Sequence, residues 1–200
     1  MMLVLTGISI VVATMSALMY AITQEPINAS KTIKQHNAIK EILPPFERVG
    51  EPEFFEVNGA TLSIYKAFDS NDDFVGAAVE SFSKNGFSGD IRIMVGFDNE
   101  GNIVNYSVLE QKETPGLGTK IVDWFKPVDK QEKSLVEKLF GFEVELVEKG
   151  NSIIGKNPGN NKLTVSQDGG EIDAITASTI SSRAFLEAVQ DAYELYLTFK

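Results

Sequence analysis

Residues 90–110 read DIRIMVGFDNEGNIVNYSVLE, and this stretch decides the fold class. Ile91, Ile93 and Val95 occupy alternate positions, which gives an extended chain one continuous apolar face. The residues DNEG at 98–101 are typical of a turn, and apolar residues return directly after it. The stretch therefore predicts a hairpin of two antiparallel strands, over residues 90–97 and 103–110.

Segments on both sides of this hairpin add further strands and helices. Strands are predicted over residues 54–57, 61–67 and 76–82, and the Asn58-Gly59 pair is typical of a tight turn between the first two. Further candidates are short strands over 142–147 and 163–167 and helices over 130–140 and 179–197. A long loop is predicted over 148–162. These elements predict an α+β domain in which helices pack against a twisted antiparallel sheet.

The chain begins with an uncharged apolar segment, residues 1–24. As a helix, this segment is long enough to cross about 30 Å of hydrocarbon. A cleaved signal peptide normally has a basic start and a shorter apolar run, so we favour a retained transmembrane anchor. Pro26 permits a fresh helix start and Pro44-Pro45 ends it, which predicts a helical stalk over 25–45 and one soluble domain over 46–200.

Small residues recur at every fourth position of the anchor: Ser9, Ala13, Ala17 and Ala21. In a helix they form one ridge, and small side chains allow two transmembrane helices to pack closely. Alanine and serine are also common in such helices without any partner. We interpret the ridge as the face that contacts other membrane subunits.

The composition excludes several classes of function. Acidic residues outnumber basic ones by 28 to 18, so the formal net charge is −10 and the basic footprint of a nucleic-acid-binding protein is missing. The chain contains no cysteine and a single histidine, His36, just beyond the anchor. Cysteine-ligated clusters and disulfides are therefore excluded, and we predict no catalytic residue and no metal site. Redox chemistry would need an organic cofactor.

Residues 173–182 read DAITASTISS and directly precede a sequence that favours a helix. The amino end of a helix presents unpaired N–H groups and a positive dipole end, which together bind phosphate. Ala177 and Ser178 are small enough to let a ligand approach the backbone. Serine and threonine are also the usual residues at a helix N-cap, and the residues alone favour that simpler explanation.

The same stretch resembles the flavinylation motif of the FMN-binding domain family, Asp-x-x-[Ser/Thr]-[Gly/Ala]-[Ala/Ser]-Thr-x-[Ser/Thr]. The motif falls on six residues: Asp173, Thr176, Ala177, Ser178, Thr179 and Ser181. The resemblance implies that a flavin transferase joins FMN covalently, through its phosphate, to the Thr179 hydroxyl. It also implies that the transferase recognises Ser181. Two roles are open for Asp173: recognition by the transferase, and orientation of the loop through hydrogen bonds from backbone N–H groups. The commonest family form has Gly and Ala where this chain has Ala177 and Ser178, which are also small.

Residues 113–118 read ETPGLG and resemble the glycine-rich loop of the same family, which lies along the flavin. This implies that four residues contact the cofactor: Glu113, Thr114, Gly116 and Leu117. A third match is LTV at 163–165 with DGG at 168–170, and Lys162 beside it either faces the flavin or is simply solvated. Trp124 and Phe125 follow the loop, where they either stack on the ring or pack in the core.

The order of these features over the whole chain resembles that of the G subunits of Rnf complexes, which are ion-translocating ferredoxin:NAD oxidoreductases. The C subunits of sodium-pumping NADH:quinone reductases share the features but are usually longer. The resemblance implies an electron carrier without substrate chemistry of its own, between the ferredoxin and NAD sides of the complex. Alternatives are a flavinylated sensor or assembly module off the main electron path, and an anchored adaptor whose Thr179 only caps a helix.

The resemblance also implies a location. A single span would hold the protein in the cytoplasmic (inner) membrane, with the soluble domain on the periplasmic, extracytoplasmic side. The basic residues Lys31, Lys34 and Lys40 follow the anchor and, by the positive-inside rule, favour the opposite orientation. Charge alone therefore does not decide the topology.

Overall fold

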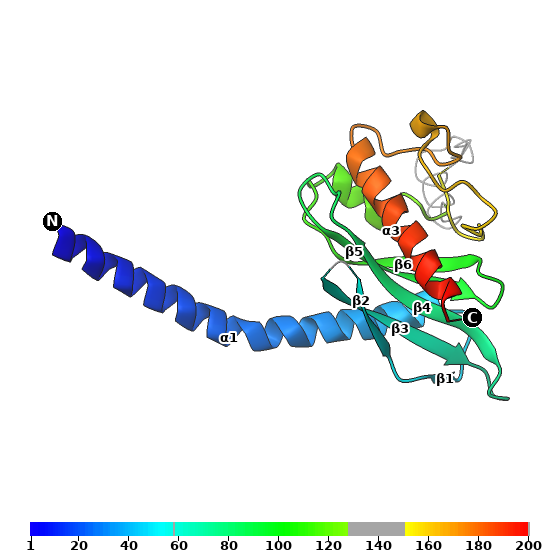
Figure 1. Ribbon diagram of the computed structural model, residues 1–200, viewed down its shortest axis with the longest axis horizontal. Helices are drawn as coiled ribbons and strands as arrows, with labels where there is room; N and C mark the ends of the chain where they lie inside the picture. Colours follow the sequence, from blue (N-terminus) through cyan, green and yellow to red (C-terminus); the bar gives the residue numbers. More distant parts are fainter. Residues whose placement is uncertain (58, 128–150, 200) are drawn as a thin grey trace, which may run out of the picture. The chain divides into compact units, whose positions relative to one another are not determined.

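The computed structural model describes residues 1–57, 59–127 and 151–199. The helix predicted over 130–140 and the strand predicted over 142–147 lie outside the described residues, as does the start of the loop predicted over 148–162. The chain divides into two compact units, Met1–Asn37 and Ala38–Lys200 (Figure 1).

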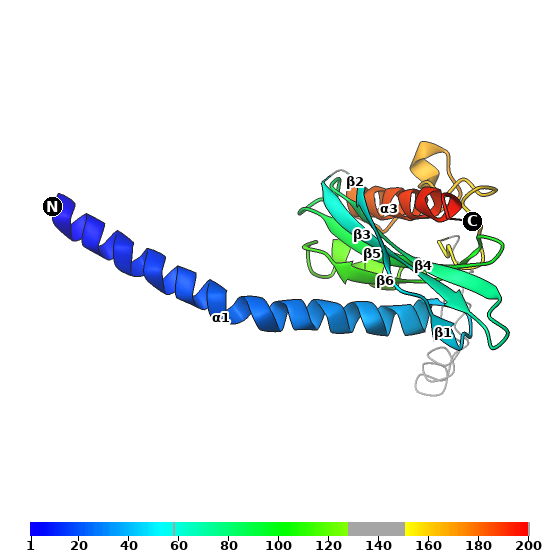
Figure 2. The same cartoon turned by 60° about the horizontal axis from the view of Figure 1, so that its bottom comes forward.

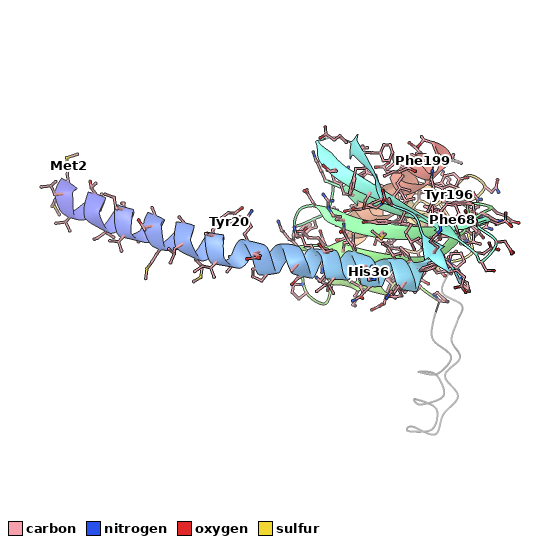
Figure 3. All side chains as sticks on the ribbon, turned by 90° about the horizontal axis from the view of Figure 1, so that it is seen from below. Met2, Tyr20, His36, Phe68, Tyr196 and Phe199 are labelled. Carbon is pink, nitrogen blue, oxygen red and sulfur yellow. The ribbon has the colours of Figure 1, made fainter. Side chains whose placement is uncertain are left out.

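The first helix, α1 (Met2–Ile42), is continuous and contains Pro26, so the predicted fresh helix start at this proline is wrong. A proline removes one hydrogen bond of the ladder, and the long helical runs on both sides preserve the helix. The predicted end of the helix before Pro44-Pro45 is confirmed. By its length and composition, the apolar part of α1 can cross a membrane, and Figure 3 shows Met2 and Tyr20 projecting from it.

One antiparallel sheet forms the centre of the second unit, with strand order β1-β3-β4-β5-β6 and β2 also paired to β3. The strands are β1 (Arg48–Val49), β2 (Glu53–Val57), β3 (Ala60–Phe68), β4 (Phe74–Ser83), β5 (Ile91–Asp98) and β6 (Ile103–Glu110). The strands predicted between residues 54 and 110 are confirmed, each within two residues of its expected bounds. Only the short β1 was not predicted.

Helices cover both faces of this sheet. The final helix, α3 (Thr179–Leu197), has the predicted bounds and packs on one face, while the end of α1 from Ala38 onward packs on the opposite face (Figure 2). Ile93 and Val95 contribute to the core under α3, and Met94 between them contributes to the core under α1. The predicted alternation is therefore confirmed, but both faces of β5 are apolar because both are covered.

The strand predicted over residues 163–167 is wrong. Within the described residues, this segment contributes an isolated parallel bridge between Val165 and Ile172, and the 3-10 helix η2 (Ser166–Asp168) follows at once. Gly169, at φ 75°, ends η2 in a left-handed conformation that glycine adopts freely. The DGG sequence at 168–170 thus turns the chain before a strand can extend.

Candidate functional site

The glycine-rich loop and the amino end of α3 meet around a cavity of about 290 Å³. The loop follows β6 and leads into the 3-10 helix η1 (Gly118–Val122), and a third side comes from residues 84–90 between β4 and β5. Ten residues line the cavity: Phe87, Glu113, Thr114, Leu117, Gly118, Ala177, Ser178, Thr179, Ile180 and Ser181. Two segments that are distant in the sequence therefore share one site.

The glycine-rich loop is a tight turn. The Leu117 N–H donates to the Thr114 carbonyl at 3.1 Å, and the Gly116 N–H donates to Thr119 Oγ1 at 2.9 Å. Gly116 has a φ of 75°, and a Cβ built on it would meet open space. Glycine is therefore needed here for backbone conformation and not for room.

The first turn of α3 presents its backbone toward the same cavity. Thr179 is the first residue of the helix, and the N-cap is Ser178, whose side chain forms no capping hydrogen bond. The Ser182 hydroxyl instead donates to the Ser178 carbonyl and accepts from the Ile175 N–H, both at 3.0 Å. The amino end of α3 is thus fixed from within, without a side-chain cap over its first N–H groups.

Ala177 introduces a local strain just before this helix, because its φ is 62°. A left-handed conformation costs a residue with a side chain about 1–2 kcal/mol. Glycine lacks this penalty but loses more entropy on folding, so we expect Ala177→Gly to raise the free energy of unfolding by about 0.5–1 kcal/mol. Thermal denaturation would measure this increase in stability. Ala174→Gly, where φ is not positive, is the matched control and should destabilise; equal losses in both variants would contradict the prediction.

Glu113 connects the three sides of the cavity. Its Oε2 accepts a hydrogen bond from the Ser181 hydroxyl at 2.6 Å, and its Oε1 accepts one from the Ser88 N–H at 3.1 Å. The side chains of Glu113 and Ser181 are buried. The first turn of α3, the glycine-rich loop and residues 84–90 are therefore held together by one carboxylate.

Comparison with known proteins agrees with this geometry. The model of the FMN-binding domain family matches residues 86–194, more than half of the chain, and the match spans both segments of the cavity. The chain belongs to the FMN-binding domain family. The α+β architecture expected for the family is confirmed as well.

Relatives of this FMN-binding domain protein include G subunits of ion-translocating oxidoreductase complexes. That of Methanosarcina acetivorans is 30% identical over 94% of this chain and 88% of the relative. That of Aliivibrio fischeri is 28% identical over 98% of this chain and 89% of the relative. That of Yersinia pestis is 28% identical over 92% of this chain and 82% of the relative. The resemblance to Rnf G subunits is therefore confirmed, and the chain is similar to subunits of ion-translocating oxidoreductase complexes over nearly its full length.

Seven of the residues predicted for the FMN site line this one cavity: Glu113, Thr114, Leu117, Ala177, Ser178, Thr179 and Ser181. Four do not. Gly116 and Thr176 are exposed beside it, and Asp173 is exposed with its carbonyl accepting a hydrogen bond from Trp124 Nε1 at 3.0 Å. Lys162 lines a different cavity. Contact between any of these residues and FMN remains a prediction.

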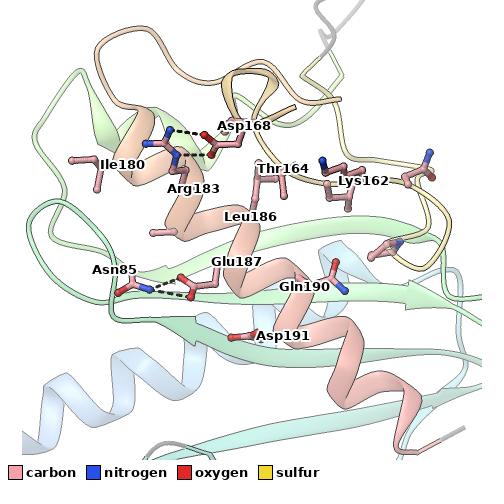
Figure 4. A pocket seen from close by; sticks show the side chains of 15 residues that line it. Asn85, Lys162, Thr164, Asp168, Ile180, Arg183, Leu186, Glu187, Gln190 and Asp191 are labelled. Carbon is pink, nitrogen blue, oxygen red and sulfur yellow. Dashed lines mark hydrogen bonds and ion pairs between the residues drawn. The ribbon is translucent and has the colours of Figure 1, made fainter. Parts of the chain in front are cut away.

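The second cavity, of about 690 Å³, lies over the outer side of α3 (Figure 4). Ile180 lines both cavities. Arg183 and Asp168 form a two-pronged ion pair at its rim, with Nε–Oδ2 at 2.6 Å and Nη2–Oδ1 at 2.8 Å. The hydrogen bonds from Arg183 hold the pKa of Asp168 below its ordinary value. This pair joins η2 to the first turns of α3, so the DGG stretch supports the site from outside.

Three lining residues were not among the predicted contacts: Gly118, which lies inside the glycine-rich loop, and Phe87 and Ile180, which were missed altogether. Phe87 comes from a loop with no motif of its own, and Ile180 occupies a variable position of the flavinylation motif. Phe125 is fully buried and stacks on Phe185, with ring centroids 4.7 Å apart, so the core interpretation of Phe125 is correct. Trp124 is half-buried, and like Phe125 it lies outside the lining of the 290 Å³ cavity.

Tyr106 of β6 fixes the segment that follows the glycine-rich loop. Its hydroxyl donates to the Ile121 carbonyl at 2.9 Å and accepts from the Phe125 N–H at 3.3 Å. We expect Tyr106→Phe to lower the free energy of unfolding at neutral pH by about 1–2 kcal/mol, because both buried partners lose their hydrogen bond. Tyr20→Phe, on the exposed part of α1, is the matched control.

The same variant should change the response to alkaline pH. Burial raises the pKa of Tyr106 above its ordinary value, so the folded state favours the protonated phenol. The stability that depends on this proton is complete below about pH 10 and is lost as the pH rises further. Denaturant titrations across this range should show a steeper loss in the wild type than in Tyr106→Phe. Parallel curves would contradict the assignment.

Proposed function

We propose that this chain carries FMN bonded through its phosphate to the Thr179 hydroxyl, and that it relays electrons between the ferredoxin and NAD sides of an ion-translocating redox complex. The observation that carries the proposal is the position of Thr179. It is the first residue of α3, is half-buried, and lines one cavity together with the glycine-rich loop. A phosphate on its side chain would stand at the amino end of this helix.

The residues around Thr179 suit such a phosphodiester, which carries one negative charge. The helix dipole and the first N–H groups of α3 stabilise an anion at this end. Ser178 leaves these groups without a side-chain cap. The left-handed conformation of Ala177 turns the preceding chain away from the helix axis, so the attachment point remains accessible.

The cavity suits a flat ring that stays partly exposed to solvent. Its volume of about 290 Å³ is just below the roughly 300–1,000 Å³ typical of ligand sites. Phe87, Leu117 and Ile180 offer exposed apolar surface around the cavity. When bound, FMN supplies the electron-transfer chemistry, and the protein supplies position and electrostatic environment.

The membrane segment completes the proposal. The apolar part of α1 would anchor the subunit in the cytoplasmic membrane, with the flavin domain on the extracytoplasmic side. Ser9, Ala13, Ala17 and Ala21 would contact another membrane subunit. A carrier role agrees with the relatives, which are subunits of oxidoreductase complexes. The reported relatives favour a G subunit over the C subunit of a sodium-pumping quinone reductase, whereas a sensor or assembly role has no specific observation in its favour.

The proposal is tested by the intact mass of the full chain after co-expression with a flavin transferase. We expect a gain of one FMN less one water, and visible flavin absorbance that survives denaturation. Reconstitution into membranes that hold the other subunits should then restore electron transfer from reduced ferredoxin to NAD. An unmodified chain would contradict covalent attachment of FMN. A modified chain that restores no electron transfer would contradict the relay role.

A further inference from the structure

The wall of the proposed FMN cavity contains a buried carboxylate, Glu113. Among the described residues it forms hydrogen bonds but no ion pair. Glu113 is 4% exposed, and both side-chain oxygens accept hydrogen bonds, one from the Ser88 N–H and one from the Ser181 hydroxyl. Acceptance at both oxygens is the pattern that an ionised carboxylate forms. A negative charge is therefore fixed in position at the edge of the site.

Two glycines make room for this carboxylate. A Cβ at Gly118 would lie 2.5 Å from Glu113 Oε2 and 2.7 Å from the Ser181 hydroxyl oxygen. A Cβ at Gly86 would lie 2.2 Å from the Gly89 carbonyl oxygen and 2.8 Å from Glu113 Oε1. All of these distances are shorter than any normal contact, so a side chain at either position would press on its neighbours. The second glycine of ETPGLG thus serves the carboxylate as well as the turn.

A comparison with Glu80, a second buried glutamate of the described residues, shows what is unusual about Glu113. Glu80 is 2% exposed and is neutralised by Arg92, whose Nη1 lies 2.6 Å from its Oε1. Within the described residues, Glu113 has no cationic partner, and the amino end of α3 is the positive group beside it. A buried charge without a counter-ion destabilises a fold. A structural role alone would be served as well by a neutral side chain of the same shape.

We propose that Glu113 lowers the reduction potential of the flavin carried in this cavity, and that Ser181 is a positioning residue that holds its carboxylate there. This inference rests on the proposed function. Two-electron reduction of the ring, with uptake of one proton, gives a reduced form with one more negative charge than the oxidised form. A fixed negative charge beside the ring disfavours that added charge, and so favours the oxidised ring.

The test is a spectroelectrochemical titration of the full-length flavinylated chain in detergent. Glu113→Gln and Glu113→Met both remove the charge while keeping a side chain of similar length. Each should raise the midpoint potential so that the ratio of reduced to oxidised flavin at a fixed potential rises at least tenfold, which is about 30 mV for a two-electron couple. The exposed Glu56→Gln, outside the cavity, is the matched control and should leave the potential unchanged.

Ser181→Ala separates the charge from the hydrogen bond. It keeps the carboxylate but removes the hydrogen bond from residue 181 that holds it in position. The absorption bands of the flavin should therefore broaden, and the midpoint potential should rise less than in Glu113→Gln. Equal rises in Ser181→Ala and Glu113→Gln would overturn the electrostatic role, as would an unchanged potential in both neutral variants. A wild-type chain without flavin would overturn the proposed function and this inference with it, whereas a flavinylated chain insensitive to Glu113 would overturn this inference alone.

Discussion

Replacing Thr179 by alanine is expected to abolish covalent attachment of FMN completely. The hydroxyls of Ser181 and Ser182, in the same turn of α3, cannot take its place, because both are held in hydrogen bonds. The Ser181 hydroxyl donates to Glu113, and the Ser182 hydroxyl is fully buried between the Ile175 N–H and the Ser178 carbonyl. Thr176 is exposed but lies outside the cavity lining. We therefore expect all of the added mass to depend on Thr179.

Intact mass of the co-expressed chain measures this directly. Thr179→Ser keeps a hydroxyl at the same place and should retain attachment, while Thr176→Ala is the matched control for loss of a nearby threonine. Thr179 is half-buried and forms no side-chain hydrogen bond among the described contacts, so Thr179→Ala should change the free energy of unfolding by only about 0.5 kcal/mol. A mass gain that persists in Thr179→Ala would place the bond on another residue.

The strands of this domain could be predicted because a period of two residues is a local property of the chain. Ile91, Ile93 and Val95 show their common face without reference to any partner, and they are fully buried together. The strand β1 could not be predicted in this way, because two residues carry no period. Its pairing with Phe68 and Ala67 depends on where α1 returns the chain to the sheet.

Two local rules gave wrong predictions for physical reasons. Pro26 was expected to separate two helices, but one missing hydrogen bond is a small loss within a helix as long as α1. Residues 163–167 were expected to form a strand from their apolar pattern. The DGG turn that follows leaves them a single bridge, at Val165, so turn chemistry decides the structure there.

The two segments of the candidate site could be identified from the sequence, but their contact could not. Glu113 and Ser181 are 68 residues apart. Nothing in either motif indicates that the Ser181 hydroxyl donates a hydrogen bond to the Glu113 carboxylate. The sequence likewise contains no sign that Lys162 lines the second cavity, although it stands beside a family motif. Long-range packing sets both outcomes, and a local pattern does not contain it.

Gly96→Ala is expected to detach the end of α1 from the sheet. Gly96 lies in β5 where the helix end crosses it, and a Cβ there would lie 1.9 Å from the Ile42 carbonyl oxygen and 2.6 Å from its carbon. Both are backbone atoms, so no side-chain rotation relieves the overlap. The cluster that would be disturbed includes Ile39, Ile42 and Leu43, all buried against the sheet. We expect a loss of about 3–5 kcal/mol in the free energy of unfolding.

Chemical denaturation of the full chain in detergent would measure this loss, with Gly50→Ala as the matched control. A Cβ at Gly50 has no neighbour closer than 3.5 Å, so that variant should stay within about 0.5 kcal/mol of the wild type. Equal stability of Gly96→Ala and Gly50→Ala would mean that the helix end does not pack on β5. If the loss is found, the last turns of α1 belong to the core of the flavin domain. A soluble fragment would then need to start at or before Ala38, because one that starts at residue 46 exposes Ala67, Ala78 and Met94.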